Sequence, residues 1–404
     1  MEPVARKVMY RLYPSVAQIQ SLLAMLGLHQ RLYNAALEQR IAAWRLGRHR
    51  VTFAQQCHEL TELRAADAAY GTLNAQSAQV TLKRLDLAFR AFFRRVRAGQ
   101  TPGFPRFKSL DRFSGWGYKT HGDGFRFRPG DGNRHGKLRL SGIGTIAVRG
   151  RARTRGEAVT CEIQRKGDRW YASFTIECTP ERRSGIVAVG LDWGVEIFAT
   201  LAYDDGSFAE IANPRFVRAA KGQLEVAQQN LSRKRRASKN RRKAKAVVAA
   251  IQRKIANRRR DFLHQQSAKL INRANLIATE SLAVKNMTTS ARGTIESPGR
   301  NVAQKAGLNR EILSTAPSAF LAMLRYKAAE AGTEYVEVPS RTVKPTQRCW
   351  KCWSVRKKRL DERQHVCPCG VVLGRDRNSA RVNLLWALAQ TGREPAGCLA
   401  SVAS

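Results

Sequence analysis

The sequence is poor in acidic residues and in long apolar stretches, and it has few cysteines outside one cluster. Asp and Glu number 31 of 404 residues against 72 Lys and Arg, which leaves a net charge of +41. A folded chain this basic repels itself unless a polyanion neutralises it, and nucleic acid is the polyanion that fits. No apolar run reaches the length of a transmembrane helix, and no amphipathic segment stands apart as an anchor. We therefore expect a nucleic-acid partner and no membrane partner.

The length and the cysteine usage bound the class of protein further. A chain of 404 residues with 43% hydrophobic residues has room for two or three domains and is not disordered by composition. The start, MEPVARKVMYRLYPS, lacks the apolar core of a signal peptide. Four of the eight cysteines lie between Cys349 and Cys369 and the others are scattered, which is not a disulfide framework. A reducing, cytosolic setting and a metal site fit this pattern.

The apolar pattern of the first half predicts helices inserted into a small β-barrel. Residues 4–13 alternate like a strand, and Pro14-Ser15 is typical of a helix start. Helical spacing follows, and it returns over residues 53–66 and 75–98. Gly-rich and charged turns separate further predicted strands, at residues 125–128, 137–140, 144–149, 158–164 and 170–176. We expect residues 4–13 to contribute one strand to this barrel.

The second half predicts a mixture of strands and helices. Apolar runs on both sides of Gly190-Leu191-Asp192-Trp193-Gly194 predict two buried strands joined by a turn. Residues 224–270 predict two long helices with a basic elbow between them. The remaining predictions are a strand at 276–282, a flexible loop at 288–309, a helix at 312–332, a strand at 333–338 and a last helix at 379–390.

Two basic stretches are candidates for nucleic-acid contact. Lys and Arg make up 14 of the 28 residues from Arg233 to Arg260, and the helical period of the apolar residues there argues against a disordered tail. One face of the helix at 75–98 carries charges that are almost all positive. A charged face is often merely solvated, but charges of a single sign favour contact with phosphates. Three residues on or beside one face are nominated to read a base sequence: Gln76, Gln79 and Thr81. The basic candidates are Lys83, Arg84, Arg233, Lys234, Arg235, Arg236, Arg241 and Arg242.

Four cysteines in two close pairs predict a structural zinc site. Cys349 and Cys352 form a Cys-x2-Cys pair, and fourteen residues separate it from the Cys-x-Cys pair Cys367 and Cys369. Four thiolates suit tetrahedral zinc and leave no open coordination position, so the ion would support the fold rather than react. The second pair is shorter than the usual Cys-x2-Cys, and His365 is a candidate to replace one ligand. Two unrelated cysteine pairs are the alternative.

Three acids, Asp192, Glu280 and Asp376, each stand at a predicted strand end or turn. A buried carboxylate needs a partner, and hard oxygen ligands are what magnesium binds. We hypothesise that the partner of Asp192 is a metal ion whose cage Glu280 and Asp376 complete. The alternative is a turn aspartate satisfied by backbone amides. Spacing alone does not select Glu280 above the competing acids, which are Asp204, Asp205, Glu210 and Glu296.

The order of these motifs resembles the TnpB family, RNA-guided endonucleases that insertion sequences encode and that are related to type V CRISPR effectors. The resemblance covers nearly the whole chain. The motifs that carry it are QRLYN at 30–34, AFRAFFRR at 88–95, PGFPRFK at 102–108, GLDWG at 190–194, IATESL at 277–282, the cysteine cluster and RDRNSA at 375–380. Each motif alone is weak, whereas their order together is specific.

The resemblance implies an architecture of the α/β and β class. It implies a RuvC-like, RNase H-type nuclease domain with an inserted zinc ribbon, preceded by a β-barrel wedge domain with an inserted helical recognition domain. The implied boundaries are 1–14 and 100–183 for the wedge domain, 15–99 for the recognition domain, 184–347 and 373–390 for the nuclease domain, 348–372 for the zinc ribbon, and 391–404 for a disordered tail.

The resemblance also implies an activity and its partners. The protein would be an RNA-guided DNA endonuclease that cleaves double-stranded target DNA next to a short transposon-associated motif, with a guide RNA from the transposon end. Asp192, Glu280 and Asp376 fall on the catalytic positions and would bind two magnesium ions, while the four cysteines would bind zinc. We expect a monomeric ribonucleoprotein in a prokaryotic cytoplasm, associated with the nucleoid.

Two departures from the family pattern and four rival functions stand beside this interpretation. Gly374 occupies a position where many relatives have a further Asp, and the Cys367-x-Cys369 pair is one residue short. A CRISPR-associated type V effector would look alike. A nuclease-inactive RNA-guided repressor would keep the fold and charge but lose an acid, and all three acids are present. A structural RNA-binding protein would show no metal-dependent cutting, and a transposase with the same nuclease fold would yield strand-transfer products.

Overall fold

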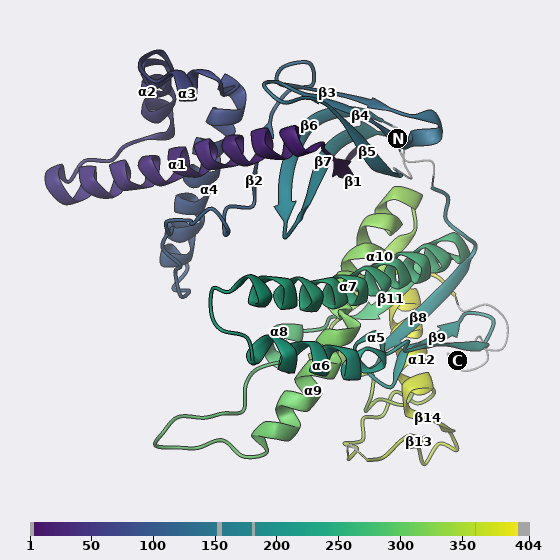
Figure 1. Cartoon of the computed structure of the whole chain (residues 1–404). Coiled ribbons are helices and arrows are strands. Elements are labelled where there is room, and N and C mark those ends of the chain that lie inside the picture. Colours follow the sequence, from purple (N-terminus) through teal and green to yellow (C-terminus); the bar gives the residue numbers. More distant parts are fainter. Residues whose placement is uncertain (1–3, 152–155, 180–181, 360, 395–404) are drawn as a thin grey trace. The chain divides into compact units, whose positions relative to one another are not determined.

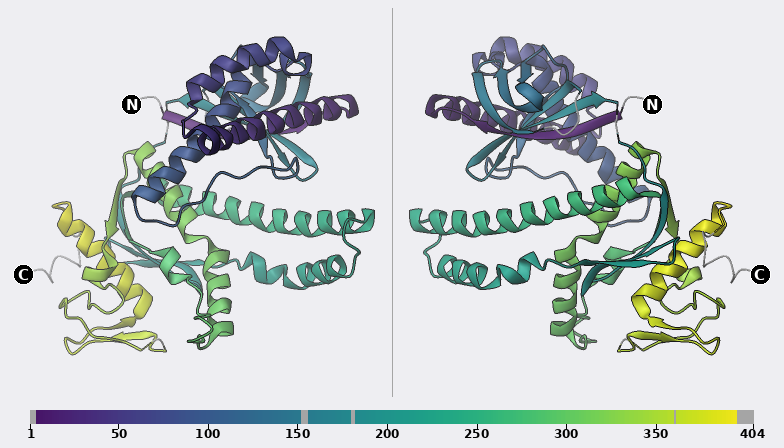
Figure 2. Two further views of the ribbon diagram at one scale, coloured as in Figure 1. Left: turned by 90° about the vertical axis from the view of Figure 1, so that its left-hand side faces the viewer. Right: turned by 90° about the vertical axis from the view of Figure 1, so that its right-hand side faces the viewer.

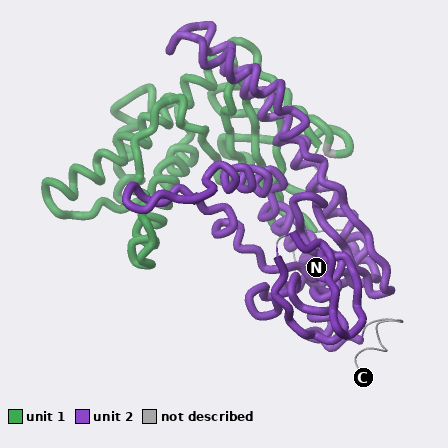
Figure 3. The backbone as a smooth tube through the Cα atoms, turned by 90° about the horizontal axis from the view of Figure 1, so that it is seen from below, with its two compact units in different colours: residues 1–180 green, residues 181–404 purple. Residues whose placement is uncertain are grey.

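The chain folds into two compact units, residues 1–180 and 181–404 (Figure 3). The computed structural model describes residues 4–151, 156–179, 182–359 and 361–394. After the last helix, residues 391–394 still contact the rest of the unit. Thr391 donates its backbone N–H to the carbonyl of Ala387, and Arg393 pairs with Glu334 at 3.0 Å. The predicted disordered tail therefore does not include residues 391–394, and its remainder, 395–404, lies outside the described residues.

A seven-stranded antiparallel sheet forms the base of the first unit, in the order β2-β6-β7-β1-β5-β4-β3. Its inner face buries alternate residues of β1, β4 and β5, as with Tyr10 and Leu12 of β1, because side chains alternate across a strand. The two edge strands, β2 and β3, contact each other through side chains: the ring centroids of Tyr118 of β2 and Phe125 of β3 are 5.9 Å apart. The strands are β1 (Val4–Tyr13), β2 (Gly115–Tyr118), β3 (Phe125–Pro129), β4 (Arg134–Leu140), β5 (Gly144–Arg151), β6 (Glu157–Lys166) and β7 (Arg169–Cys178).

The helices of the first unit lie between β1 and β2 in the sequence, as predicted (Figure 1). They are α1 (Val16–Gly47), α2 (Phe53–Ala66), α3 (Ala68–Gly71) and α4 (Ala75–Arg97). Ser15 with Gln18 and Thr52 with Gln55 form capping boxes, which explains why α1 and α2 begin where the sequence predicted. The short strand β2 was missed, because four residues of which two are glycine carry no readable alternation.

A five-stranded mixed sheet organises the second unit, in the order β10-β9-β8-β11-β12. Strands β8, β11 and β12 run parallel, while β9 and β10 run antiparallel to their neighbours. Helices cover both faces: α7 and α10 pack through Leu270, Ile271 and Phe320, and α12 packs on the other side through Val382 and Leu384. The strands are β8 (Val187–Trp193), β9 (Ile197–Tyr203), β10 (Phe208–Ala212), β11 (Ala274–Glu280) and β12 (Glu334–Val338).

The basic region folds as the predicted helix pair, α6 (Lys221–Ser232) and α7 (Lys239–Arg273), which lie side by side (Figure 2). Helix α12 covers Arg375–Gln390. The short elements are the 3-10 turn η1 (Asp131–Asn133), helices α5 (Phe216–Ala219), α8 (Val284–Met287) and α11 (Ser340–Val343), and the hairpin β13 (Gln364–Val366) and β14 (Val372–Gly374).

Three predictions in the second unit were wrong in their boundaries. The predicted loop at 288–309 contains the start of α9 (Val302–Thr315), whose polar sequence hides the helical period. The predicted helix at 312–332 is two helices, because Ala316 adopts a left-handed φ of 53° and Pro317 starts α10 (Pro317–Ala331). Helix α12 begins at Arg375 rather than residue 379, so Asp376 lies in its first turn.

None of the helices in the described ranges has the length and apolar character to cross a membrane.

Candidate active site

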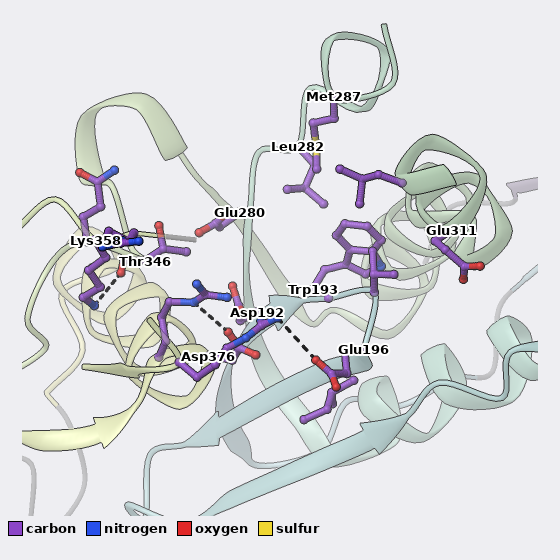
Figure 4. A pocket seen from close by; sticks show the side chains of 18 of the residues that line it. Asp192, Trp193, Glu196, Glu280, Leu282, Met287, Glu311, Thr346, Lys358 and Asp376 are labelled. Atoms are coloured by element: carbon purple, nitrogen blue, oxygen red, sulfur yellow. Dashed lines mark hydrogen bonds and ion pairs between the residues drawn. The ribbon is translucent and has the colours of Figure 1, made fainter. Parts of the chain in front are cut away.

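A pocket of about 760 Å³ in the second unit contains all three predicted acids in its lining (Figure 4). Asp192 lies near the end of β8 and Glu280 at the end of β11, and these adjacent parallel strands pair Leu191 with Thr279. The carboxyl ends of parallel neighbours meet at one edge of a sheet, which brings the two acids together. Asp376 comes from the first turn of α12. Residues separated by almost two hundred positions therefore share one pocket.

Gly190 sets how closely α12 approaches the sheet. A Cβ atom at this position would lie 2.1 Å from the carbonyl oxygen of Ala380 and 2.6 Å from the backbone nitrogen of Leu384. No side chain fits there, so the helix backbone rests directly on β8. Asn383 reinforces the contact by donating its Nδ2–H to the carbonyl of Leu191 at 3.0 Å. Gly190, two residues before Asp192, therefore allows close approach of the backbone of α12.

Ser379 is the residue that sequence reasoning passed over. Its buried hydroxyl lies 2.8 Å from Oδ1 of Asp192 and 3.5 Å from Oε1 of Glu280, so it bridges the two acids. The signal that could have identified it is its position three residues after Asp376, on the same face of a helix. The serine holds the Asp192 carboxylate in one orientation.

Burial and mutual repulsion perturb the titration of the acids. Burial raises the pKa of Asp192 well above its ordinary value, and the charges of Glu280 and Asp376 raise it further, against the hydrogen bond from Ser379 and the charge of Arg375. Burial raises the pKa of Glu280 to about 7, again against the hydrogen bond from Ser379. Carboxylates that resist ionisation in this way are stabilised as anions by a cation beside them. The raised pKa values therefore mark a place where a bound cation would favour the ionised acids, in a pocket whose lining also includes arginine and lysine side chains.

The donor set fits magnesium by its chemistry, since three carboxylates line one open pocket. Their oxygens are spread more widely than the ligands of a single ion. Across the described ranges, only the cysteine cluster brings three or more ligand atoms within 4.8 Å of one another. The predicted cage around one shared ion is therefore not what the side chains form. Two ions about 3.5–4 Å apart would suit a wider set of donors.

The competing acids are engaged elsewhere. Asp204 accepts the backbone N–H of Ala188 in β8 at 2.9 Å, and Asp205 accepts that of Ser207 in the turn between β9 and β10 at 2.8 Å. Glu210 pairs with Arg377 at 3.1 Å. The lining of the acidic pocket includes none of these acids.

The four cysteines gather at one point, with their sulfur atoms within 4.8 Å of one another. Cys349 and Cys369 are 3.6 Å apart, and Cys352 and Cys367 are 3.4 Å apart. Zinc–sulfur bonds of about 2.3 Å in a tetrahedron place sulfurs about 3.8 Å apart, so the cluster has the dimensions of a zinc site. Both cysteines of the shortened Cys-x-Cys pair, Cys367 and Cys369, belong to this set.

His365 does not belong to the cysteine cluster. Its ring is buried, neither ring nitrogen has a hydrogen-bond partner in the described structure, and it is absent from the set of close ligand atoms. Burial, with Lys358 and Arg356 nearby, lowers its pKa to about 4, which keeps the ring neutral. The prediction that His365 replaces a ligand is not supported, because four thiols already fill the site.

The residues nominated on α4 differ in exposure, and Thr81 is not available to read bases. Thr81 is fully buried and its hydroxyl lies 2.8 Å from Nδ1 of His29. Thr81 is five residues after Gln76, so at 3.6 residues per turn the two side chains point to different sides of α4, and the side that carries Thr81 is the covered one. Gln79 is half-buried and accepts a hydrogen bond from Lys119 at 3.0 Å, and Gln76 is half-buried as well.

The basic candidates on α4 have partners within the protein. Arg84 donates to the carbonyl of Gly115 and lies 3.7 Å from Glu162. Lys83 pairs with Asp86 at 3.4 Å and lies over the ring of Phe53. Both side chains remain partly exposed, and Arg84 above all fixes α4 to the sheet.

The turn between α6 and α7 and the residues beside it present several exposed cations. Arg241 holds the turn by donating to the carbonyls of Leu231 at 2.8 Å and Lys234 at 3.1 Å. Lys234 is half-buried, and four neighbours are exposed: Arg233, Arg235, Arg236 and Arg242. Arg241 therefore arranges a cluster of exposed guanidinium groups.

Comparisons with known proteins agree over most of the chain. The family described as "Probable transposase" of IS605 OrfB type matches residues 159–291, and a Cas12f1-like TNB domain matches residues 318–383. A helix-turn-helix family matches residues 1–49, and the described residues 4–47 within this range form a strand and one long helix, β1 and α1.

Two curated relatives carry the name "Putative RNA-guided DNA endonuclease". The protein from Streptomyces pristinaespiralis is 31% identical over 395 residues, covering 96% of this chain and 90% of the relative. InsQ of Escherichia coli (strain K12) is 31% identical over 346 residues, covering 83% and 80%. A cryo-EM structure of a Cas12f1-sgRNA-target DNA complex is similar in fold, with a TM-score of 0.60 at 11% identity, covering 94% of this chain and 99% of that one.

Proposed function

The chain belongs to the TnpB family of insertion-sequence proteins, and from this premise we propose that it is an RNA-guided DNA endonuclease that cleaves target DNA beside a short transposon-associated motif. The guide RNA comes from the transposon end and pairs with one DNA strand, so that base pairing supplies the sequence specificity. Relatives that align along most of the chain carry the same activity in their names. The charge of +41 suits a protein that holds an RNA and a DNA together.

The convergence of Asp192, Glu280 and Asp376 in one pocket is the observation that carries the proposal. The order of the mixed sheet, with β8 between antiparallel β9 and parallel β11, supports a RuvC-like, RNase H-type nuclease domain. Asp192 and Glu280 lie at one edge of that sheet, and Asp376 lies in the first turn of α12, which packs on the sheet. We assign these three residues as the ligands of two magnesium ions.

When bound, magnesium supplies an activated water and stabilises the departing oxygen of a phosphodiester. The protein's own contribution is to hold and orient the ligands. Ser379 fixes Asp192 and tethers Glu280, and Arg375 lies 3.5 Å from Asp376. Cationic side chains on the same pocket, including Arg215, Arg218 and Arg363, are placed to contact the phosphates of an entering strand.

The cysteine cluster acts as a structural zinc site in this proposal. Asn378 connects it to the catalytic helix, because its Nδ2–H donates to the carbonyl of Arg348 at 2.7 Å and its Oδ1 accepts from the backbone of Trp350. Zinc thereby steadies the segment that precedes Asp376. Metal analysis should find about one zinc per chain, and substitution of Cys349 by Ser should release it.

The exposed arginines between α6 and α7 are proposed to bind the nucleic-acid backbone. Lys83, Gln76 and Gln79 are secondary candidates, since each keeps part of its side chain exposed. We propose that the working particle is a monomeric ribonucleoprotein, so light scattering should give the mass of one 45.2 kDa chain and one RNA.

The test is cleavage of a plasmid by the ribonucleoprotein purified from cells that also express the guide RNA. Wild-type protein should cut only the plasmid that carries the target and the flanking motif, and only with magnesium. Asp192→Asn should keep the RNA but lose cleavage. Asp205→Asn is the matched control, because Asp205 is an exposed turn acid of the same unit that lies outside the pocket lining. Full cleavage by Asp192→Asn would overturn the assignment of the metal site.

A further inference from the structure

A second cavity, in the first unit, plays no part in the proposed nuclease chemistry. Its volume is about 490 Å³, within the usual range for ligand pockets. The end of α1, the loop that follows it, α4 and Phe104 form its walls. All of these segments belong to one compact unit. The cavity combines two kinds of side chain, aromatic rings and arginines, and each kind carries information about what it binds.

Three aromatic side chains of the cavity are about half exposed to solvent. Phe104 packs edge-on against Phe89 at 5.6 Å and against Phe92 at 5.4 Å between ring centroids. Trp44 keeps 54% of its surface exposed, Phe93 51% and Phe104 48%. Several large aromatic side chains exposed around one cavity indicate a binding surface rather than a closed core. Flat π-faces in such a place are suited to stacking against a flat ligand.

The charge of the cavity is positive and is not neutralised from within. Arg40, Arg45, Arg50 and Arg90 line it, and Asp86 is the acid among its lining residues. Asp86 is already engaged, at 2.9 Å from Arg90, 3.4 Å from Lys83 and 3.6 Å from Arg40. The remaining guanidinium groups therefore attract an anion, and phosphate is the anion that matches their planar donors.

Arg40 adds an independent observation that points to a ligand. Its side chain is only 9% exposed, its Nε–H donates to Gln56 at 2.9 Å, and its guanidinium lies over the ring of Phe89. Its Nη2 atom is buried and has no hydrogen-bond partner in the described part of the chain. An unpaired donor in such a place is unfavourable by about 1–3 kcal/mol, so an acceptor from outside the protein would remove the penalty.

We propose that this cavity binds one unpaired nucleotide of the bound nucleic acid, with its base stacked on the aromatic rings and its phosphate on the arginines. A nucleobase offers a flat π-face and carbonyl or ring-nitrogen acceptors for Arg40, and its phosphate supplies the anion. The inference rests on the proposed function, because an RNA-guided nuclease holds both RNA and DNA strands with unpaired segments. The nucleotide can come from the guide RNA or from the target DNA, and the experiment separates these sources.

Ultraviolet cross-linking of the full-length ribonucleoprotein tests the proposal directly. After irradiation and digestion, mass spectrometry should find a nucleotide on the peptide that contains Trp44 or on the peptide that contains Phe89–Phe93. A cross-link without target DNA identifies the RNA as the source, and one that requires target DNA identifies the DNA. No adduct on either peptide in both states would overturn the proposal, as would a cross-link from the cavity to a second protein chain.

Substitution of Trp44 provides the quantitative test. Loss of one stacked base weakens binding by roughly tenfold, so Trp44→Ala should lower the affinity for the nucleic acid identified by cross-linking by about that factor in filter binding. Leu46→Ala is the matched control, because Leu46 is 89% exposed and lies outside the cavity. Arg50→Ala should weaken binding and Arg50→Lys should restore part of it. Equal affinities for Trp44→Ala and Leu46→Ala would overturn the proposal.

The failure of this inference can be told apart from failure of the nuclease proposal. If wild-type protein cleaves its target and the Trp44 variant binds and cleaves as the Leu46 control does, only the nucleotide cavity is refuted. If wild-type protein does not cleave yet carries a nucleotide on Trp44 or on Phe89–Phe93, only the nuclease assignment is refuted.

Discussion

Each unit of the molecule buries a small cluster of titratable and hydroxyl side chains, and the two clusters are built in opposite ways. In the first unit, His29 lies 2.8 Å from the hydroxyl of Thr81 and 3.4 Å from that of Ser77 and stacks on Trp116. In the second unit, Ser379 contacts Asp192 and Glu280. The histidine cluster is closed and burial keeps its imidazole neutral, whereas the acidic cluster lines a pocket and its carboxylates repel one another when ionised. A buried polar cluster that satisfies itself serves the fold, and one left unbalanced at a pocket is a candidate for chemistry.

The largest expected effect is on the rate of DNA cleavage, which should depend on the acidic cluster and not on the histidine cluster. Glu280→Gln removes one proposed metal ligand while keeping the size of the side chain, and it should slow plasmid cleavage by roughly a thousandfold or more, because metal stabilisation of a transition state amounts to several kcal/mol. Single-turnover cleavage by the ribonucleoprotein measures the change. Glu210→Gln should cleave at the wild-type rate, since Glu210 lies outside the pocket. Equal rates for the two variants would remove Glu280 from the site.

The next difference is in stability, and here the histidine cluster dominates. His29→Ala leaves a cavity against Trp116 and leaves the buried Thr81 hydroxyl with one partner fewer, so it should destabilise the first unit by about 3 kcal/mol. Urea denaturation followed by tryptophan fluorescence measures this loss. His58→Ala is the control, because His58 is exposed on α2 and should change little. If His29→Ala lowers the free energy of unfolding by no more than His58→Ala does, the histidine cluster does not stabilise the fold.

The pH dependence of stability should differ in sign between the clusters. Burial lowers the pKa of His29 from 6.5 to about 3, so the unfolded chain binds a proton that the folded chain does not. The contribution of His29 is complete above pH 6.5 and is lost as pH falls toward 3, by about 2 kcal/mol between pH 6.5 and 5. Denaturation of the first unit at these two pH values, compared with His29→Gln, isolates the effect. An identical slope in the variant would contradict it.

The acidic cluster should show the reverse trend when metal is absent. Burial, with the charges of Glu280 and Asp376, raises the pKa of Asp192, so the folded chain binds more protons than the unfolded one and its stability falls as pH rises. Asp192→Asn removes this repulsion and should raise the unfolding temperature by a few degrees in EDTA at neutral pH, equivalent to about 1 kcal/mol. Added magnesium should reduce the difference in unfolding temperature between Asp192→Asn and the wild-type protein. If Asp192→Asn is less stable than the wild-type protein in EDTA, repulsion between the acids does not destabilise the folded state.

The sequence by itself determined the features that depend on neighbours along the chain. The capping boxes at Ser15 and Thr52 and the apolar periods of α2, α6 and α7 are local, and so is the cysteine spacing that predicted one metal cluster. The motif order was enough to indicate the family. These features depend on backbone propensity and side-chain spacing, which are properties of short segments.

Only the tertiary structure decided which side chains meet and which are covered. Ser379 reaches both Asp192 and Glu280 because Gly190 lets α12 rest on β8, a contact between segments almost two hundred residues apart. Thr81 proved to be buried against His29 rather than exposed for reading bases. The unpaired Nη2 of Arg40 could not be foreseen from composition either. Burial and pairing are set by packing between distant segments, and the spacing of residues within one helix does not fix which of its neighbouring positions the rest of the fold will cover.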